Sequence, residues 1–180
     1  MARAAINIKG MWDERTQDQR PEQEPPLPRR MTQAQNRSSP DLDRENSELI
    51  RRAAELLKIS HADARKAAQV VLHAIRDRLP RDVLIRFGEQ LPSFERRLYF
   101  SGWKSNPPLR TTFRAFLSDI QEKLPEVCRN DPISATRAVV LAIRECIDGR
   151  AQIRKVKEAF SPEMQPLFEP SRNDVHPCAG

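Results

Sequence analysis

Two stretches, VVLHAIRDRL (residues 70–79) and AVVLAIRECI (residues 138–147), carry the same pattern. A shift of 68 positions places Val71, Ala74, Ile75 and Arg76 on Val139, Ala142, Ile143 and Arg144. Upstream, a shift of 67 matches Leu49, Ile50, Ala53 and Leu57 with Phe116, Leu117, Ile120 and Leu124. Downstream, a shift of 69 matches Leu91, Leu98 and Tyr99 with Phe160, Leu167 and Phe168. Because self-similarity at a fixed spacing is typical of repeated supersecondary units, the sequence predicts two copies of one unit.

Each copy is expected to be helical. Apolar residues recur at the i, i+3, i+4 spacing that forms one helix face, and no alternation of useful length predicts a strand. Ser60 is a predicted N-cap, Pro80 a stop, and the DP pair at 131–132 a second N-cap with proline at N1. Gly88 and Gly149 are expected to end the helices that precede them. We therefore expect helices over about 49–57, 60–79, 83–87, 113–124, 132–149 and 150–159, with a short last helix opened by SPE at 161–163.

The predicted fold is an all-α bundle of roughly eight helices, built from two tandem, similar units. The units span residues 45–103 and 111–169, and the proline-rich stretch KSNPPLR (104–110) joins them within a single domain over 45–170. One unit alone leaves an apolar face uncovered, so the two are expected to pack together with approximate internal two-fold symmetry. Residues 1–44, rich in Pro, Gln and Arg, and residues 171–180 lack such a pattern and are expected to be disordered.

The composition limits the classes of partner that the chain could bind but does not identify one. The chain has a net charge of +6 and 31% charged residues. This bias permits nucleic acid, anionic lipid or an acidic protein as partner. The longest apolar run, AVVLAI, is too short for a membrane span. Cys128, Cys146 and Cys178 are an odd set without a CxxC pair, which favours a reducing cytoplasm.

No pattern of catalytic or ligand-binding residues emerges. The five glycines form no phosphate-binding loop, and His61, His73 and His176 have no companion at metal-ligand spacing. Cys146 is expected to be a small buried hydrophobe. We therefore predict no catalytic residue, cofactor, metal or small-molecule ligand.

The stretch GRAQIRKVK (149–157) is the best candidate for recognition. It places Arg150, Arg154, Lys155 and Lys157 on one short helix, which could contact nucleic acid or an acidic partner. Together with the helix before it, this helix faintly resembles a helix-turn-helix motif, although an Asn that could read bases is absent. An ordinary solvated helix face is nevertheless the favoured interpretation of this stretch.

The most individual stretch is QLPSFERRLYFSGW (90–103), which we interpret as a helix stop rather than a ligand site. Pro92 suits the first turn of a short helix, and Gly102 suits the left-handed residue that follows its end. In that register Trp103 and Leu98 form the hydrophobic contact of a Schellman motif.

The same stretch resembles the bacterial family called domain of unknown function 2267. That family carries Gln-Leu-Pro, an Arg and an aromatic segment ending in Gly-Trp, matched here by Gln90, Leu91, Pro92, Arg96, Leu98, Tyr99, Gly102 and Trp103. The chain departs from the family at Glu95, Phe100 and Ser101. FRAFLSDIQEKL and FSPEMQPLF are similar to the family's second half, so the resemblance covers about 47–169. It implies an all-helical domain of unassigned biochemistry.

These observations favour a non-enzymatic domain that works by protein contact or self-association in the cytoplasm. Nucleic-acid binding through residues 150–157 is the alternative. An enzyme with a cleft between the two units is the weaker one.

Overall fold

The computed structural model describes residues 47–104, 111–147 and 149–178. All of these residues belong to one compact body. The predicted tail over 1–44 and most of the predicted linker over 104–110 lie outside the described residues.

The described part of the chain is all helical, as predicted, and no strand occurs in it. It contains seven α-helices, where roughly eight helices were expected for the chain: α2 (Glu48–Leu57), α3 (His61–Arg76), α4 (Arg81–Gln90), α5 (Ser93–Phe100), α6 (Phe113–Lys123), α7 (Pro132–Cys146) and α8 (Arg150–Glu158). Three short 3-10 turns complete it: η1 (Glu126–Cys128), η2 (Gln165–Phe168) and η3 (Arg172–Asp174).

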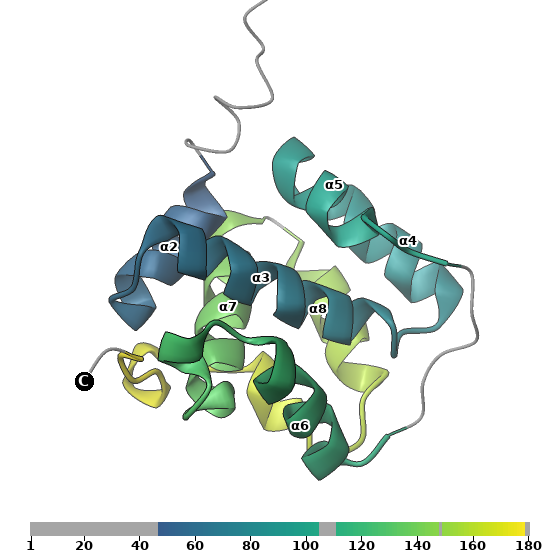
Figure 1. Ribbon diagram of the computed structural model, residues 1–180. Coiled ribbons are helices and arrows are strands. Elements are labelled where there is room, and N and C mark those ends of the chain that lie inside the picture. The colour runs from purple at the N-terminus through teal and green to yellow at the C-terminus, as the bar shows by residue number, and fades with distance from the viewer. Residues whose placement is uncertain (1–46, 105–110, 148, 179–180) are drawn as a thin grey trace, which may run out of the picture. The chain divides into compact units, whose positions relative to one another are not determined.

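The order of elements follows the two predicted units. The elements α2, α3, α4 and α5 correspond in order to α6, α7, α8 and η2. Packing crosses between the units, because α2 lies on α7, α6 lies on α3, and α4 lies on α8. Figure 1 shows α3 running between the α4–α5 pair and α6. The two units therefore share one apolar core.

That core is built from the apolar stripes that define the helices. Leu49, Leu72, Phe116 and Ile120 are fully buried or nearly so, and Tyr99 is the largest side chain with no exposed surface. Burial of each large aliphatic or aromatic side chain contributes about 1.5–3 kcal/mol. The hydroxyl of Tyr99 donates to the carbonyl of Leu84 at 3.3 Å, so its polar atom is satisfied within the core.

Two predicted N-caps are confirmed. Ser60 accepts a hydrogen bond from the backbone N–H of Asp63 at 3.1 Å, at the start of α3. Asp131 accepts from the N–H of Ser134 at 2.9 Å, and Pro132 is the first residue of α7. Each cap satisfies a backbone donor that has no partner within its helix.

Two helices end earlier than predicted. α3 ends at Arg76, because the next turn tightens through bonds from Arg78 N to Ile75 O (3.1 Å) and from Leu79 N to Arg76 O (3.2 Å). Pro80 then precedes α4 instead of terminating α3. α7 ends at Cys146, since the backbone of Ile147 is extended.

Gly88 does not end a helix, contrary to the prediction. It lies inside α4 without a positive φ, two residues before the end at Gln90. A Cβ atom at this position would lie 2.5 Å from Cζ of Phe100, which is closer than real contacts allow. The glycine therefore permits the close approach of the Phe100 ring and does not terminate the helix.

The helix stop at Gly102 is confirmed in part. Gly102 has the predicted positive φ, +63°, but the predicted Schellman motif is wrong. Ser101 is extended (φ −60°, ψ 131°), and Trp103 N donates to Phe100 O at 3.1 Å, which defines a type II turn. The Trp103 ring is half-buried and meets the Phe100 ring edge-on, at 6.0 Å between centroids.

The segment 171–178 is ordered against the helices, although residues 171–180 were expected to be disordered. Ser171 and Asp174 form a capping box on η3, and Val175 is buried. The backbone N–H of His176 donates to Ser134 Oγ at 3.0 Å, a contact with α7 that no local pattern reveals. The short last helix is likewise displaced, because it is a 3-10 turn that begins at Gln165.

Candidate functional site: a cationic pocket beside α8

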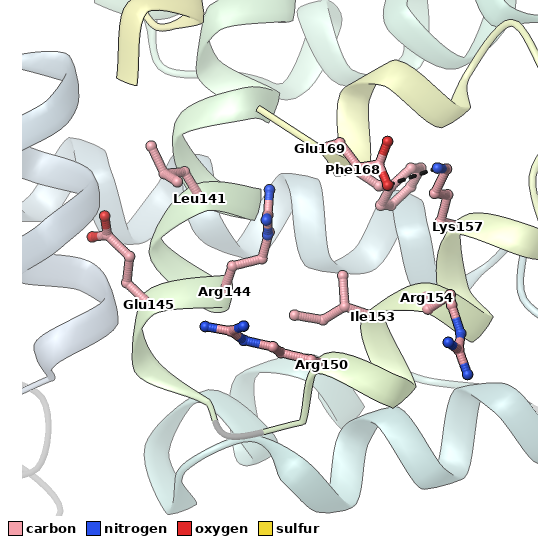
Figure 2. Close-up of a pocket in the computed structure, with 9 residues that line it drawn as sticks. All are labelled: Leu141, Arg144, Glu145, Arg150, Ile153, Arg154, Lys157, Phe168 and Glu169. Carbon is pink, nitrogen blue, oxygen red and sulfur yellow. Dashed lines mark ion pairs between the residues drawn. The ribbon is translucent and has the colours of Figure 1, made fainter. Parts of the chain in front are cut away.

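A pocket of about 390 Å³ opens between α7, α8 and η2, and we call it the cationic pocket. Its lining combines apolar side chains, four cations and two carboxylates: Leu141, Ile153, Phe168, Arg144, Arg150, Arg154, Lys157, Glu145 and Glu169. In Figure 2 the side chain of Arg150 reaches back from the start of α8 toward α7, below Arg144. Ile153 lies between α7 and α8 in the same view, whereas the head of Arg154 points away from Arg144.

Helical geometry selects which basic residues of α8 line this pocket. Arg150, Arg154 and Lys157 follow the i, i+4, i+7 spacing of one face. The buried side chains of Ile153 and Val156 hold that face against the body. Lys155 is exposed and does not line the pocket. Of the four basic residues predicted from the sequence, the pocket brings together three.

Both carboxylates of the pocket have cationic partners. Lys157 Nζ lies 2.7 Å from Glu169 Oε1, and this bond lowers the pKa of the Glu169 carboxyl. Glu145 is bonded by Arg52 of α2 and lies 3.4 Å from Arg172 Nη2. The bond with Arg52 is the main cause that lowers the pKa of Glu145. Both carboxyl groups are therefore ionised and engaged at neutral pH.

The arginines are less fully occupied. Arg144 Nη1 donates to the carbonyl of Pro170 at 3.3 Å. Arg154 Nε lies 3.7 Å from Glu158 Oε1 in an exposed pair, which contributes little in water. Arg150 has no hydrogen bond or ion pair with any residue that the structure describes. The pocket therefore presents guanidinium groups that can bind the carboxylate or phosphate of a ligand.

Comparison of the two units explains why the pocket is polar. At a shift of 69, Gly88 corresponds to Lys157 and Phe100 to Glu169. In the first unit the Phe100 ring packs on Gly88, so that place is filled by an aromatic side chain. In the second unit the same pair of positions holds the ion pair between Lys157 and Glu169.

Two corresponding arginines show the same difference. Arg76 is 5% exposed, and its Nη1 donates to the carbonyls of Tyr99 at 2.6 Å and Ser101 at 2.9 Å. Its counterpart Arg144 donates to Pro170, which corresponds to Ser101 at the shift of 69. Arg144, however, is exposed to the pocket. The repeat in the sequence aligns Arg144 with Arg76 but does not mark Arg144 as a site residue, because it lies on α7 and not in the basic stretch.

A second pocket, of about 330 Å³, lies between α3 of the first unit and α6 of the second, and we call it the α3–α6 pocket. It is lined in part by His73, whose pKa is lowered chiefly by burial. Nε2 of His73 lies 2.8 Å from the carbonyl of Leu98, and the hydroxyl of Ser101 donates to the same carbonyl at 2.7 Å. Because Nε2 must carry a proton to make this bond, it is not positioned as a base toward Ser101.

The remaining walls of the α3–α6 pocket carry three cationic side chains and two carboxylates. Arg78, 8% exposed, is bonded by Asp119 and stacks over the Phe116 ring at 5.0 Å. Among the described residues, no group of three His, Cys, Asp or Glu side chains could hold a metal ion. This pocket offers a packed ion pair and no arrangement for a chemical step.

The Gln-Leu-Pro to Gly-Trp stretch lies apart from the lining of both pockets, and its members pack or terminate helices. Leu91 and Tyr99 are buried, Leu98 and Trp103 half-buried, and Gln90, Pro92, Arg96 and Gly102 exposed. Arg96 Nη2 donates to the carbonyls of Glu89 at 2.8 Å and Leu91 at 3.0 Å. It thus satisfies backbone acceptors at the C-terminal end of α4, where the helix leaves them without partners.

Comparison with known proteins assigns most of the described residues to one family. The model of a family described as "Uncharacterized conserved protein (DUF2267)" matches residues 46–167. This range agrees closely with the 47–169 predicted from the resemblance. A search of curated proteins gave no match. Across the residues that the structure describes, every helix falls short of the length and hydropathy that a membrane crossing requires.

Proposed function

The chain belongs to the family of uncharacterized conserved proteins DUF2267, and on that premise we propose that it is a non-enzymatic protein-interaction module. In this proposal the cationic pocket holds an acidic segment of a partner protein. The carboxylates of the segment bind the guanidinium groups, and an apolar side chain beside them rests on Leu141, Ile153 and Phe168.

One observation carries the proposal: Arg150 has no anionic partner among the described residues, although it lines a pocket. A guanidinium group presents a rigid fork of donors that matches a carboxylate, and such charge-assisted bonds contribute about 1.5–3 kcal/mol each. Arg144, held by a single carbonyl at 3.3 Å, can turn toward the same ligand. The two engaged carboxylates restrict the ligand to the part of the pocket near these arginines.

The exposed surface favours polar recognition. Among the described residues, Val127, 43% exposed, is the one large hydrophobic side chain that faces solvent. An interface that these residues make is therefore polar, which is typical of modest affinities and of association that depends on salt. Self-association through a broad apolar face finds no support in this part of the chain, but a second copy can still supply the acidic segment.

Nucleic-acid binding by α8 is the competing function. The basic residues of α8 are exposed on more than one face, which a phosphate backbone could follow. Three carboxylates, Glu145, Glu158 and Glu169, lie close to those basic residues and would repel phosphates. A short acidic peptide can enter between them more easily than a duplex can.

The test uses the full chain and a fluorescein-labelled peptide in which glutamates flank one leucine. Its binding is measured by fluorescence anisotropy in 50 mM and 300 mM salt, beside the same peptide with glutamine in place of glutamate. We expect the acidic peptide alone to bind, more weakly in high salt. Arg150→Gln should weaken binding about tenfold or more, which is the loss of one charge-assisted bond.

Lys155→Gln is the matched control, because it removes the same charge from the same helix outside the pocket. We expect it to change peptide binding less than twofold. Equal losses in the two variants would show diffuse attraction and contradict the proposal, as would no binding at 50 mM salt. Tight binding of a labelled DNA duplex with a steep salt dependence, weakened equally by both substitutions, would support the nucleic-acid function instead.

A further inference from the structure

Glu169 occupies the cationic pocket in the way that the proposed ligand would. It directly follows Phe168, and both residues line the pocket, so an apolar side chain and a carboxylate stand next to each other in the chain. Phe168 is buried, whereas the carboxylate of Glu169 bonds to Lys157 Nζ at 2.7 Å. Figure 2 shows this ion pair across the pocket from Glu145.

This ion pair can open from the side of the glutamate. The side chain of Lys157 is 26% exposed and that of Glu169 is 62% exposed, so the carboxylate is the freer of the two partners. Glu169 lies just after η2 and outside any regular helix. Because an ion pair with so exposed a member contributes little to stability in water, the carboxylate of a partner can replace Glu169 on Lys157 at little cost.

Glu145, the other carboxylate of the pocket, is held more firmly. It is bonded by Arg52 of α2, and Arg172 Nη2 lies 3.4 Å from its Oε1. These contacts join α7 to α2 and to the segment 171–178. Glu145 is therefore a fixed part of the wall, and Glu169 is the carboxylate that a ligand can displace.

Lys157 offers a second binding point to a ligand that Arg150 already binds. The two residues lie on one face of α8, and seven helical steps place them about 10 Å apart along its axis. Ile153 lies between them and lines the same pocket. Two glutamates that flank one residue of an extended segment are about 7 Å apart at the backbone, and their long side chains cover the remainder.

We propose that Glu169 is a built-in competitor for the ligand, and that an acidic partner segment binds fully only when its second carboxylate displaces Glu169 from Lys157. This inference rests on the proposed function, because it requires the first carboxylate to bind Arg150. In the first unit the corresponding residue, Phe100, packs on Gly88 and carries no charge. The exchange of one carboxylate for another is therefore a property of the second unit.

The experiment compares the full chain with its Glu169→Gln variant by fluorescence anisotropy. One labelled peptide has two glutamates that flank a leucine, and in a second peptide one of these glutamates is glutamine. Glu169→Gln should bind the two-glutamate peptide about three- to fivefold more tightly than the wild type does, which is the strength of an exposed ion pair. The gain for the one-glutamate peptide should be less than about twofold, because that peptide has no second carboxylate for Lys157.

Two further variants serve as controls. Lys157→Gln, added to Glu169→Gln, should remove the gain, since the released ammonium group is what binds the second carboxylate. Glu163→Gln removes the same charge at an exposed position outside the pocket lining and should change the affinity less than about twofold. Because Glu163 and Glu169 are both exposed, each glutamine variant should keep the wild-type fold, which circular dichroism verifies.

The outcomes separate this inference from the function on which it rests. Equal affinities of the wild type and Glu169→Gln for the two-glutamate peptide would overturn the inference, as would an equal gain in Glu163→Gln or a gain that survives Lys157→Gln. In each of these cases, peptide binding that still depends on Arg150 would leave the proposed function intact. Absence of binding by both the wild type and Glu169→Gln would overturn the inference and the function together.

Discussion

At the scale of single residues, Gly88 shows how one missing side chain shapes the fold. It lies within α4 and is buried, where glycine costs about 1 kcal/mol of helix stability relative to alanine. The structure accounts for this cost, since the Phe100 ring occupies the space of the absent Cβ. Phe100 in turn touches the rings of Tyr99 and Trp103. Gly88 therefore provides the space in which the aromatic cluster at the end of the first unit packs.

Gly88→Ala is accordingly expected to lower the free energy of unfolding by about 1–2 kcal/mol. Overpacking of this kind costs about 1–3 kcal/mol, and the better helix propensity of alanine offsets part of it. Urea unfolding measures the change. In a Phe100→Ala background, where the space is open, the same substitution should be neutral or stabilising. A loss of the same size in both backgrounds would show that Phe100 is not the cause.

At the scale of elements, corresponding pieces of the two units end differently. α5 is a regular helix of eight residues, whereas its counterpart η2 is a 3-10 turn of four. The carbonyls at the end of α5 bind the buried Arg76, and the carbonyl of Pro170, just after η2, binds the exposed Arg144. Corresponding arginines thus have different roles: Arg76 is bonded to the end of α5 in the first unit, and Arg144 lines a pocket in the second.

Replacing these two arginines with methionine tests that difference. Arg76→Met leaves the carbonyls of Tyr99 and Ser101 without their donor and is expected to cost about 2–3 kcal/mol of unfolding free energy. Arg144→Met removes one long, partly buried bond and should cost less than about 1 kcal/mol. Chemical denaturation of both variants gives the comparison. Equal destabilisation would mean that Arg144 supports the fold as much as Arg76 does.

The sequence predicted those elements whose signals are local. Ser60 and Asp131 were identified as caps because the polar group and the N–H that it satisfies are three residues apart. The turn at Gly102 was predicted in its φ but not in its type, which depends on the extended backbone of Ser101. Gly88 and the packed segment 171–178 could not be predicted, since their partners, among them Phe100 and Ser134, are brought close only by the fold.

The candidate site was predicted to the same extent. The basic stretch indicated Arg150, Arg154 and Lys157, because all three lie on one helix. It also included Lys155, since charge in a sequence does not by itself reveal which face of a helix borders a pocket. Arg144 was missed because it lies on α7, outside the basic stretch, and only the fold brings it into the pocket with Arg150.

At the scale of the described body, the second unit keeps a polar hollow where the first unit is packed. The positions of the packed pair Gly88 and Phe100 hold the ion pair Lys157 and Glu169 in the second unit, and the exposed Arg144 lies beside it. The two units thus share the order of their elements and differ in the surface that can bind a partner. The α3–α6 pocket lies elsewhere, between α3 and α6, and holds the ion pair of Arg78 and Asp119.

The most direct test of this claim is a titration of the ¹⁵N-labelled full chain with the acidic peptide, followed by proton–nitrogen correlation spectra. We expect the largest shifts at the amides of the cationic pocket, at Arg144, Arg150 and Glu169. Shifts centred instead on the α3–α6 pocket, at Lys66 and Lys123, or small shifts spread over all helices, would contradict it.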